Sequence, residues 1–188
     1  IKVAPIFSDG MVLQRDTMVN IWGTAAPNTD IQILSEWGQK LSIKSNDTGA
    51  WKAKLLSPNE GGPFFLKINS NNESFIIRDI LVGEVWLASG QSNMEMSLMG
   101  YPPIDTILNY KKEIRRANYP FIRMFNVEKQ YSIVPTKDFK GSWLEASPSQ
   151  IEKFSATAYF FARELHKKLD IPIGIIHSSW GGSPCESW

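Results

Sequence analysis

The sequence contains a single cysteine, Cys185, among 188 residues. One cysteine cannot form an internal disulfide, and it excludes a metal centre built from several thiolates. Histidine is nearly as scarce, with only His166 and His177. Chemistry that requires a histidine base therefore has at most two candidates within this sequence.

Neither sign of charge predominates, because 20 Lys and Arg face 19 Asp and Glu for a formal net charge of +1. This balance gives no electrostatic reason to expect a nucleic-acid or anionic-membrane partner. No apolar run approaches the roughly 20 residues of a membrane span, and no basic-then-apolar signal peptide opens the chain. Since the sequence begins at Ile1 without a methionine, we expect that a leader has been removed.

Aromatic residues are abundant by contrast, with seven tryptophans and ten phenylalanines. Such side chains suit stacking on sugar rings, but they also fill the cores of large β-structures. With 43% hydrophobic residues the chain can bury a substantial core, which argues against wholesale disorder. The length fits one large domain or two small ones.

The first part of the chain, residues 1–78, predicts a small antiparallel β-sandwich. Short segments rich in β-branched or aromatic residues alternate with turn clusters, and no stretch of helical period interrupts them. The expected strands cover residues 18–22, 31–34, 41–43, 51–55, 64–68 and 75–77. Evenly spaced strands of this kind are typical of a sandwich. Because this part shows no catalytic residues, we interpret it as an accessory domain.

Residues 79–188 predict an α/β domain. Strands are expected at residues 80–88, 121–127 and 173–176, and the first is almost continuously apolar, as in a parallel sheet buried on both faces. One helix is expected to begin at Pro103, and a second at an N-cap on Ser155. The alternation of strand and helix is typical of a parallel sheet. The segment 128–149 is rich in Pro, Ser and Lys and predicts a long irregular loop.

Two short motifs follow the first and third of these strands. Residues 90–94 read Gly-Gln-Ser-Asn-Met, and residues 177–183 read His-Ser-Ser-Trp-Gly-Gly-Ser. The carboxyl ends of parallel strands share one edge, so the two loops are expected to meet. A helix beginning near Ser92 and the pair Gly181-Gly182 would both offer backbone N–H groups, which suit the negative oxygen of an acyl intermediate. Alternatively, Ser92 only caps a helix and the glycines form a plain turn.

The first motif, with Val85-Trp86-Leu87 before it and Glu95-Met96 after it, strongly resembles the nucleophile block of sialate O-acetylesterases, which are SGNH-type hydrolases. Other segments resemble this family in the same order: residues 7–15 its opening, residues 154–165 its helix before the second block, and residues 178–184 with Glu186 and Trp188 that block itself. The resemblance covers essentially the whole chain. It implies a metal-free and cofactor-free serine esterase that removes acetyl groups from sugar hydroxyls. It also implies that residues 79–188 are the first half of a flavodoxin-like α/β/α domain.

The resemblance assigns roles to individual residues. Ser92 is the expected nucleophile, and its own N–H helps to hold the oxyanion together with an N–H from Gly181 or Gly182. Gln91 and Asn93 are expected to bind substrate or to support the turn. Trp180 is expected to line the pocket or simply to pack, and Glu186 to brace the glycine loop or to contact substrate.

The family takes its base from an Asp-x-x-His block downstream of the glycine loop, and no aspartate here stands three residues before a histidine. His166 is expected to be a surface residue. His177 is the only local candidate base, with a structural role as the alternative. We therefore expect the N-terminal part of an esterase that is inactive alone and needs its C-terminal remainder, in the same or a separate chain. The resemblance suggests a secreted, periplasmic or lysosomal location.

Two other functions fit the same residues. An acetylxylan esterase would use the same machinery on a different sugar. A non-catalytic carbohydrate-binding module, with a vestigial Ser92 loop, would account for the aromatic residues and for the missing base.

Overall fold

The computed structural model describes residues 1–71, 73–134, 136, 139–184 and 186. It is a mixed α/β structure in which strands predominate. The chain forms two compact units, Ile1–Glu84 and Val85–Trp188. The division falls within one long strand, β8 (Glu73–Gly90), whereas the sequence placed it between residues 78 and 79. Among the described residues, no helix has the length and apolar character needed to cross a membrane.

The first unit is built from strands. They are β1 (Lys2–Val3), β2 (Val12–Gln14), β3 (Met18–Thr24), β4 (Asp30–Ser35), β5 (Lys40–Lys44), β6 (Ala50–Leu56), β7 (Gly61–Ser70) and the first part of β8. Strands β1, β3 and β6 form one antiparallel sheet, and β5, β4, β7 and β8 follow one another as antiparallel neighbours. In β6 every second residue is buried, as expected of a strand with one face on a core. All six strands predicted in this part are therefore strands, while the short β1 and β2 were not predicted.

The second unit combines a sheet with helices. Its elements after β8 are α1 (Ser92–Glu95), α2 (Tyr110–Arg116), β9 (Tyr119–Val127), β10 (Gly141–Ala146), a 3-10 turn η1 (Ile151–Lys153), α3 (Ala156–Leu169) and β11 (Ile173–Ser179). The strands lie in the order β10, β9, β11, β8, and β11 runs parallel to β9. The three strands predicted in this part are confirmed, and the parallel pair brings the carboxyl ends of β9 and β11 to one edge.

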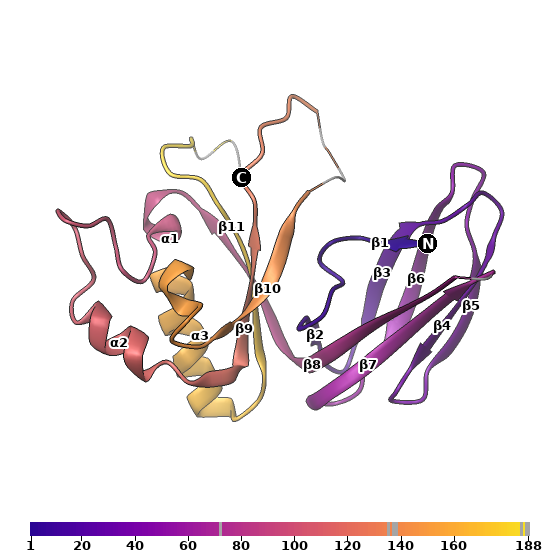
Figure 1. Ribbon diagram of the computed structural model, residues 1–188, viewed down its shortest axis with the longest axis horizontal. Helices are drawn as coiled ribbons and strands as arrows, with labels where there is room; N and C mark the ends of the chain where they lie inside the picture. The colour runs from indigo at the N-terminus through magenta and orange to yellow at the C-terminus, as the bar shows by residue number, and fades with distance from the viewer. Residues whose placement is uncertain (72, 135, 137–138, 185, 187–188) are drawn as a thin grey trace. The chain divides into compact units, whose positions relative to one another are not determined.

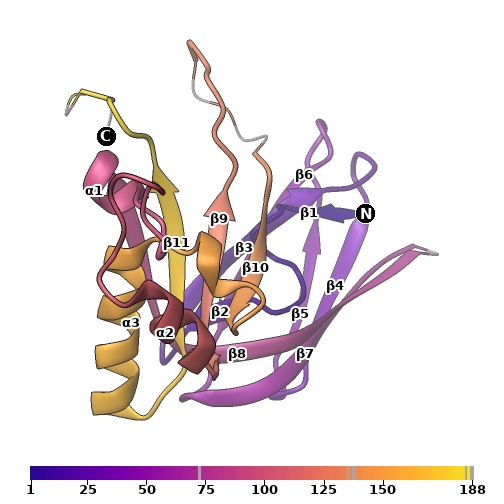
Figure 2. The ribbon, with the colours of Figure 1, turned by 60° about the vertical axis from the view of Figure 1, so that its left-hand side comes forward.

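Helix α3 fixes this sheet from one side. The Ser155 hydroxyl accepts a hydrogen bond from the Ala158 N–H at 3.2 Å, which confirms the predicted N-cap. The buried face of α3 packs on apolar residues of β9 and β11, and Figures 1 and 2 show the helix running alongside both strands. Helix α2 is tied to α3 by an ion pair between Glu113 and Arg163. The carboxyl ends of the strands are thus held on a packed support.

Two sequence expectations in this unit were wrong. The helix expected from Pro103 begins only at Tyr110, because a bridge between Tyr101 and Asp105 closes a turn there and Asn109 has a left-handed φ of 60°, which does not continue a helix. The expected irregular segment 128–149 contains β10, which pairs with β9 and packs its buried Trp143 on Phe125 at 5.6 Å between ring centroids. Its pattern does not alternate strictly, so it did not read as a strand.

Candidate active site

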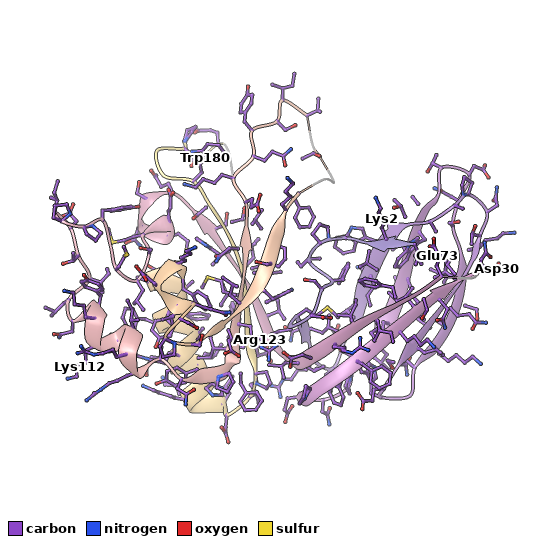
Figure 3. The ribbon with its side chains drawn as sticks, viewed as in Figure 1. Lys2, Asp30, Glu73, Lys112, Arg123 and Trp180 are labelled. Carbon is purple, nitrogen blue, oxygen red and sulfur yellow. The ribbon has the colours of Figure 1, made fainter. Side chains whose placement is uncertain are left out.

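The two predicted loops lie together at the carboxyl edge of the sheet. The Trp180 N–H, just after β11, donates to the Gly90 carbonyl at the end of β8, at 2.9 Å. A Cβ built on Gly181 would lie 3.4 Å from Ser92 Oγ. The glycine loop, which we define as residues 180–183, therefore borders the Ser92 side chain. Figure 1 shows α1 beside the end of β11, and Figure 3 labels Trp180 on the loop that follows this strand.

Ser92 is exposed at the start of the single turn α1. The N-cap of α1 is Gln91, whose carbonyl accepts the Glu95 N–H at 2.9 Å, so Ser92 does not cap this helix. Gly90 has φ 133°, which favours glycine and lets β8 turn directly into α1. Among the described residues, nothing forms a hydrogen bond with the Ser92 hydroxyl. The hydroxyl is therefore free to meet a ligand.

Helix α1 is held in place by the start of α3. The Thr157 hydroxyl donates to the Asn93 carbonyl at 3.1 Å, and the Ala156 N–H donates to the Met96 carbonyl at 2.8 Å. The side chain of Asn93 itself is exposed, as is that of Gln91. These contacts fix the backbone that carries Ser92, whereas the roles predicted for the Gln91 and Asn93 side chains stay predictions.

The glycine loop has room for a side chain at one glycine and not at the other. A Cβ on Gly181 would overlap the Glu95 carboxylate, whereas a Cβ on Gly182 would meet nothing within 4 Å. Gly182 has φ 79°, and the Ser183 N–H donates to the Trp180 carbonyl at 3.3 Å, so the loop is a tight turn. Position 181 therefore requires glycine for space, and position 182 favours it for backbone conformation.

Glu95 binds the glycine loop, which the sequence reading did not anticipate. One carboxylate oxygen accepts a hydrogen bond from the Gly181 N–H, and the other accepts a hydrogen bond from the Lys129 ammonium group. Lys129 also lies over the Trp180 ring, 5.8 Å from its centroid. The only signal in the sequence was the position of Glu95 in the nucleophile block. Glu186, predicted to brace this loop, is exposed and forms no hydrogen bond or ion pair with another described residue.

Both ring nitrogens of His177 have hydrogen-bond partners other than Ser92. Its Nδ1 lies 3.0 Å from Asn126 Oδ1, and its Nε2 lies 2.7 Å from the Ser179 hydroxyl. Burial lowers the pKa of His177 from its usual 6.5; a hydrogen bond from the ring to the Met94 backbone carbonyl acts against this, and the charge of Lys129 acts in the same direction as burial. A neutral ring therefore donates through Nδ1 to Asn126 and accepts at Nε2 from Ser179.

The other histidine is not a solvated surface residue as expected. His166 Nδ1 donates to the Ile171 carbonyl at 2.7 Å, and its ring lies between Tyr119 and Phe121. It closes the connection from α3 to β11 at the end of α3 remote from α1. Among the described residues, neither histidine forms a hydrogen bond with Ser92.

A hollow of about 670 Å³ lies beside the glycine loop. Residues 178–183 line one side, and residues 127–132 with Thr136 and Phe139 line the other. Two aromatic side chains there are open to solvent, Trp180 with 41% and Tyr131 with 81% of its surface exposed. The smaller hollows of the first unit hold none of the candidate site residues. Cys185 and Trp188 lie outside the described residues.

Comparisons with known proteins point to one kind of enzyme. No protein-family model matches the chain. Curated sialate O-acetylesterases from Homo sapiens and Rattus norvegicus are 31% and 30% identical to it, over the whole chain and over 38% and 37% of their own lengths. A solved structure described as a novel carbohydrate acetylesterase from Xanthomonas citri matches the whole chain with a TM-score of 0.92 and 37% identity, over 42% of its length. The predicted resemblance to sialate O-acetylesterases is confirmed, and the chain spans well under half the length of these relatives.

Proposed function

We propose that this chain is the nucleophile-bearing part of a carbohydrate O-acetylesterase, which removes acetyl groups from sugar hydroxyls of the sialic acid type. The observation that carries the proposal is the meeting of an exposed Ser92 hydroxyl with the glycine loop at the carboxyl edge of the sheet. Ligands of open α/β sheets bind at this edge. The acetylesterases that resemble the chain over its whole length support the same reaction.

The reaction proceeds through an acyl-enzyme. Ser92 Oγ attacks the acetyl carbonyl while its proton passes to a base, and the sugar oxygen leaves with that proton. The Ser92 N–H and one N–H of the glycine loop stabilise the negative oxygen of the tetrahedral intermediate. Water then attacks the acetyl-serine and releases acetate. Loss of one such N–H donor typically lowers kcat by about 10²- to 10³-fold.

The base comes from outside this chain. His177 is hydrogen-bonded to Asn126 and Ser179 rather than to Ser92, which supports its structural role. We therefore propose that a C-terminal remainder carrying an Asp-x-x-His block completes the enzyme, and that these residues alone do not turn over. On this interpretation the first unit is an accessory β-sandwich and the second is the first half of an SGNH-type domain. By the same resemblance, we propose a secreted, periplasmic or lysosomal location.

The hollow beside the glycine loop takes the sugar. Its volume of about 670 Å³ falls in the range of small-molecule sites. The exposed rings of Trp180 and Tyr131 offer flat apolar faces for a sugar ring. The sugar would therefore lie between the segment after β9 and the glycine loop, with its acetyl group directed at Ser92.

A fluorophosphonate probe applied to the complete protein, with the remaining polypeptide present, tests this function. Wild-type protein is expected to be labelled on Ser92 and to release acetate from acetylated sugars. Ser92→Ala should lose both properties. The control Ser149→Ala, which changes an exposed serine beyond β10, should keep both. Acetate release that persists in Ser92→Ala would overturn the proposal, as would binding of glycans without any labelling.

A further inference from the structure

Glu95 forms a charged hydrogen bond with the glycine loop, and the proposed reaction gives this residue no role. Its carboxylate bridges two groups that are far apart in the sequence, the Gly181 N–H and the Lys129 ammonium group. Hydrogen bonds from a backbone N–H or an ammonium to an ionised carboxylate are stronger than neutral ones. The Glu95 side chain is only 22% exposed, so solvent weakens these contacts less than at an open surface. The carboxylate is therefore a firm anchor for the loop.

The contact with Glu95 leaves the backbone N–H groups of Gly181 and Gly182 in different states. The Gly181 N–H is already donated to Glu95 and is not free for a substrate oxygen. The next N–H along the chain belongs to Gly182, and among the described residues it has no acceptor. Gly182 N is bonded to the carbonyl carbon of Gly181, whose Cα lies beside Ser92 Oγ. The peptide that Glu95 holds is thus directly joined to the N–H that remains available.

We propose that Glu95 is a positioning residue of the esterase, and that Lys129 holds it in place. By accepting the Gly181 N–H, the Glu95 carboxylate fixes the loop so that the Gly182 N–H points at the oxygen of the acetyl group that Ser92 attacks. Lys129 neutralises the carboxylate and keeps it on the loop, while its ammonium group also lies over the Trp180 ring. The assignment rests on the proposed function, since it specifies how the oxyanion donor is aligned.

Alignment of this kind affects the transition state more than substrate binding. A donor that is displaced by a fraction of an ångström still allows the substrate, with its neutral carbonyl, to bind. It stabilises the negative oxygen of the transition state less. Removal of the anchor should therefore lower kcat and leave KM nearly unchanged. The expected loss is about 10- to 100-fold, smaller than the 10²- to 10³-fold loss of a whole donor.

Three substitutions in the complete protein separate the contributions. Glu95→Ala removes both contacts and should lower kcat by about 10- to 100-fold, with KM changed by less than about threefold. Glu95→Gln retains an amide oxygen for the Gly181 N–H but loses the charge, so its kcat should lie between those of Glu95→Ala and wild type. Lys129→Met keeps an unbranched apolar side chain and removes the ammonium group, and it should also give an intermediate kcat.

The matched control breaks another Glu–Lys pair of the same unit, remote from the loop. Glu164→Ala removes the contact with Lys167 on the exposed face of α3, at 3.2 Å, and should leave kcat and KM unchanged. Circular dichroism and the midpoint of thermal unfolding of each variant check that it is folded. A Glu95→Ala variant that matches this control would overturn the assignment. A rise in kcat in Glu95→Ala would also overturn it, because the carboxylate would then compete with the substrate oxygen for the Gly181 N–H.

The amide proton of Gly181 provides a readout that does not depend on activity. In isotope-labelled complete protein, its NMR signal should move upfield in Glu95→Ala as the charge-assisted hydrogen bond is lost, and it should not move in Glu164→Ala. An unchanged Gly181 signal in Glu95→Ala would overturn the proposed anchor. If instead the wild-type protein shows no activity that depends on Ser92 while the Gly181 signal moves, the proposed function fails and the anchor itself stands.

Discussion

Replacing Gly181 and Gly182 by alanine, one at a time, should distinguish two reasons for glycine in this loop. Position 181 lacks space for a side chain, and position 182 has a backbone conformation that favours glycine. A methyl group on Gly181 would overlap the Glu95 carboxylate and stand 3.4 Å from Ser92 Oγ. Glu95 must then release the Gly181 N–H, so the loop loses its anchor beside the nucleophile. Position 181 has no positive φ, so its backbone suffers no strain. We expect Gly181→Ala to lower kcat/KM by about 10²-fold, or about 2.7 kcal/mol in the activation barrier, with a loss of less than about 1 kcal/mol in unfolding free energy.

Gly182→Ala should show the opposite balance. Its methyl group meets nothing within 4 Å, but φ at this position is 79°, where alanine costs about 1–2 kcal/mol. The unfolding free energy should fall by about that amount, and kcat/KM should fall by less than about tenfold because the N–H is retained. Hydrolysis of an acetyl ester and urea unfolding of the complete protein measure both quantities. Wild-type kcat/KM in Gly181→Ala would refute the reasoning.

Three further predictions concern the support of the site and its pocket. Ser155→Ala should lower the unfolding free energy by about 1 kcal/mol in denaturant titrations, because the hydroxyl caps α3, whereas Ser149→Ala should not. Because burial lowers the pKa of His177, the unfolded chain binds a proton there at a higher pH than the folded chain. The unfolding free energy should therefore fall as pH drops below about 6.5, and fall less in His177→Gln. Trp180→Ala should raise KM for an acetylated sugar by about 2- to 10-fold, as measured by acetate release, since a stacked ring contributes about 0.5–1.5 kcal/mol.

Most of the helices and strands could be predicted from local patterns in the sequence. The strand pattern of the first unit, the α3 periodicity and the Ser155 cap all depend on neighbours within a few residues, and each was predicted. β10 was missed because it is an edge strand whose hydrogen bonds come from β9. The helix expected from Pro103 was wrong because the apolar spacing that favoured it does not reveal the turn closed by Tyr101 and Asp105 or the left-handed backbone of Asn109.

The candidate site also has a part that the sequence predicted and a part that it did not. The meeting of Ser92 with the glycine loop follows from the general geometry of parallel strands, and the motifs themselves mark the two loops. Glu95 was not selected, because its partner Gly181 lies 86 positions away and Lys129 lies 34 positions away. Side-chain contacts over such separations depend on how the loops fold back. Patterns of residue type along the chain do not encode them.

Acetylation of the nucleophile itself tests the central claim most directly. The complete protein would be mixed with an activated acetyl ester, quenched in acid during turnover, digested and analysed by mass spectrometry. The proposed chemistry predicts one acetyl group on Ser92, which disappears in Ser92→Ala together with acetate release. Acetyl groups found on Ser179 or His177 instead, or steady acetate release with Ser92 unmodified, would contradict it.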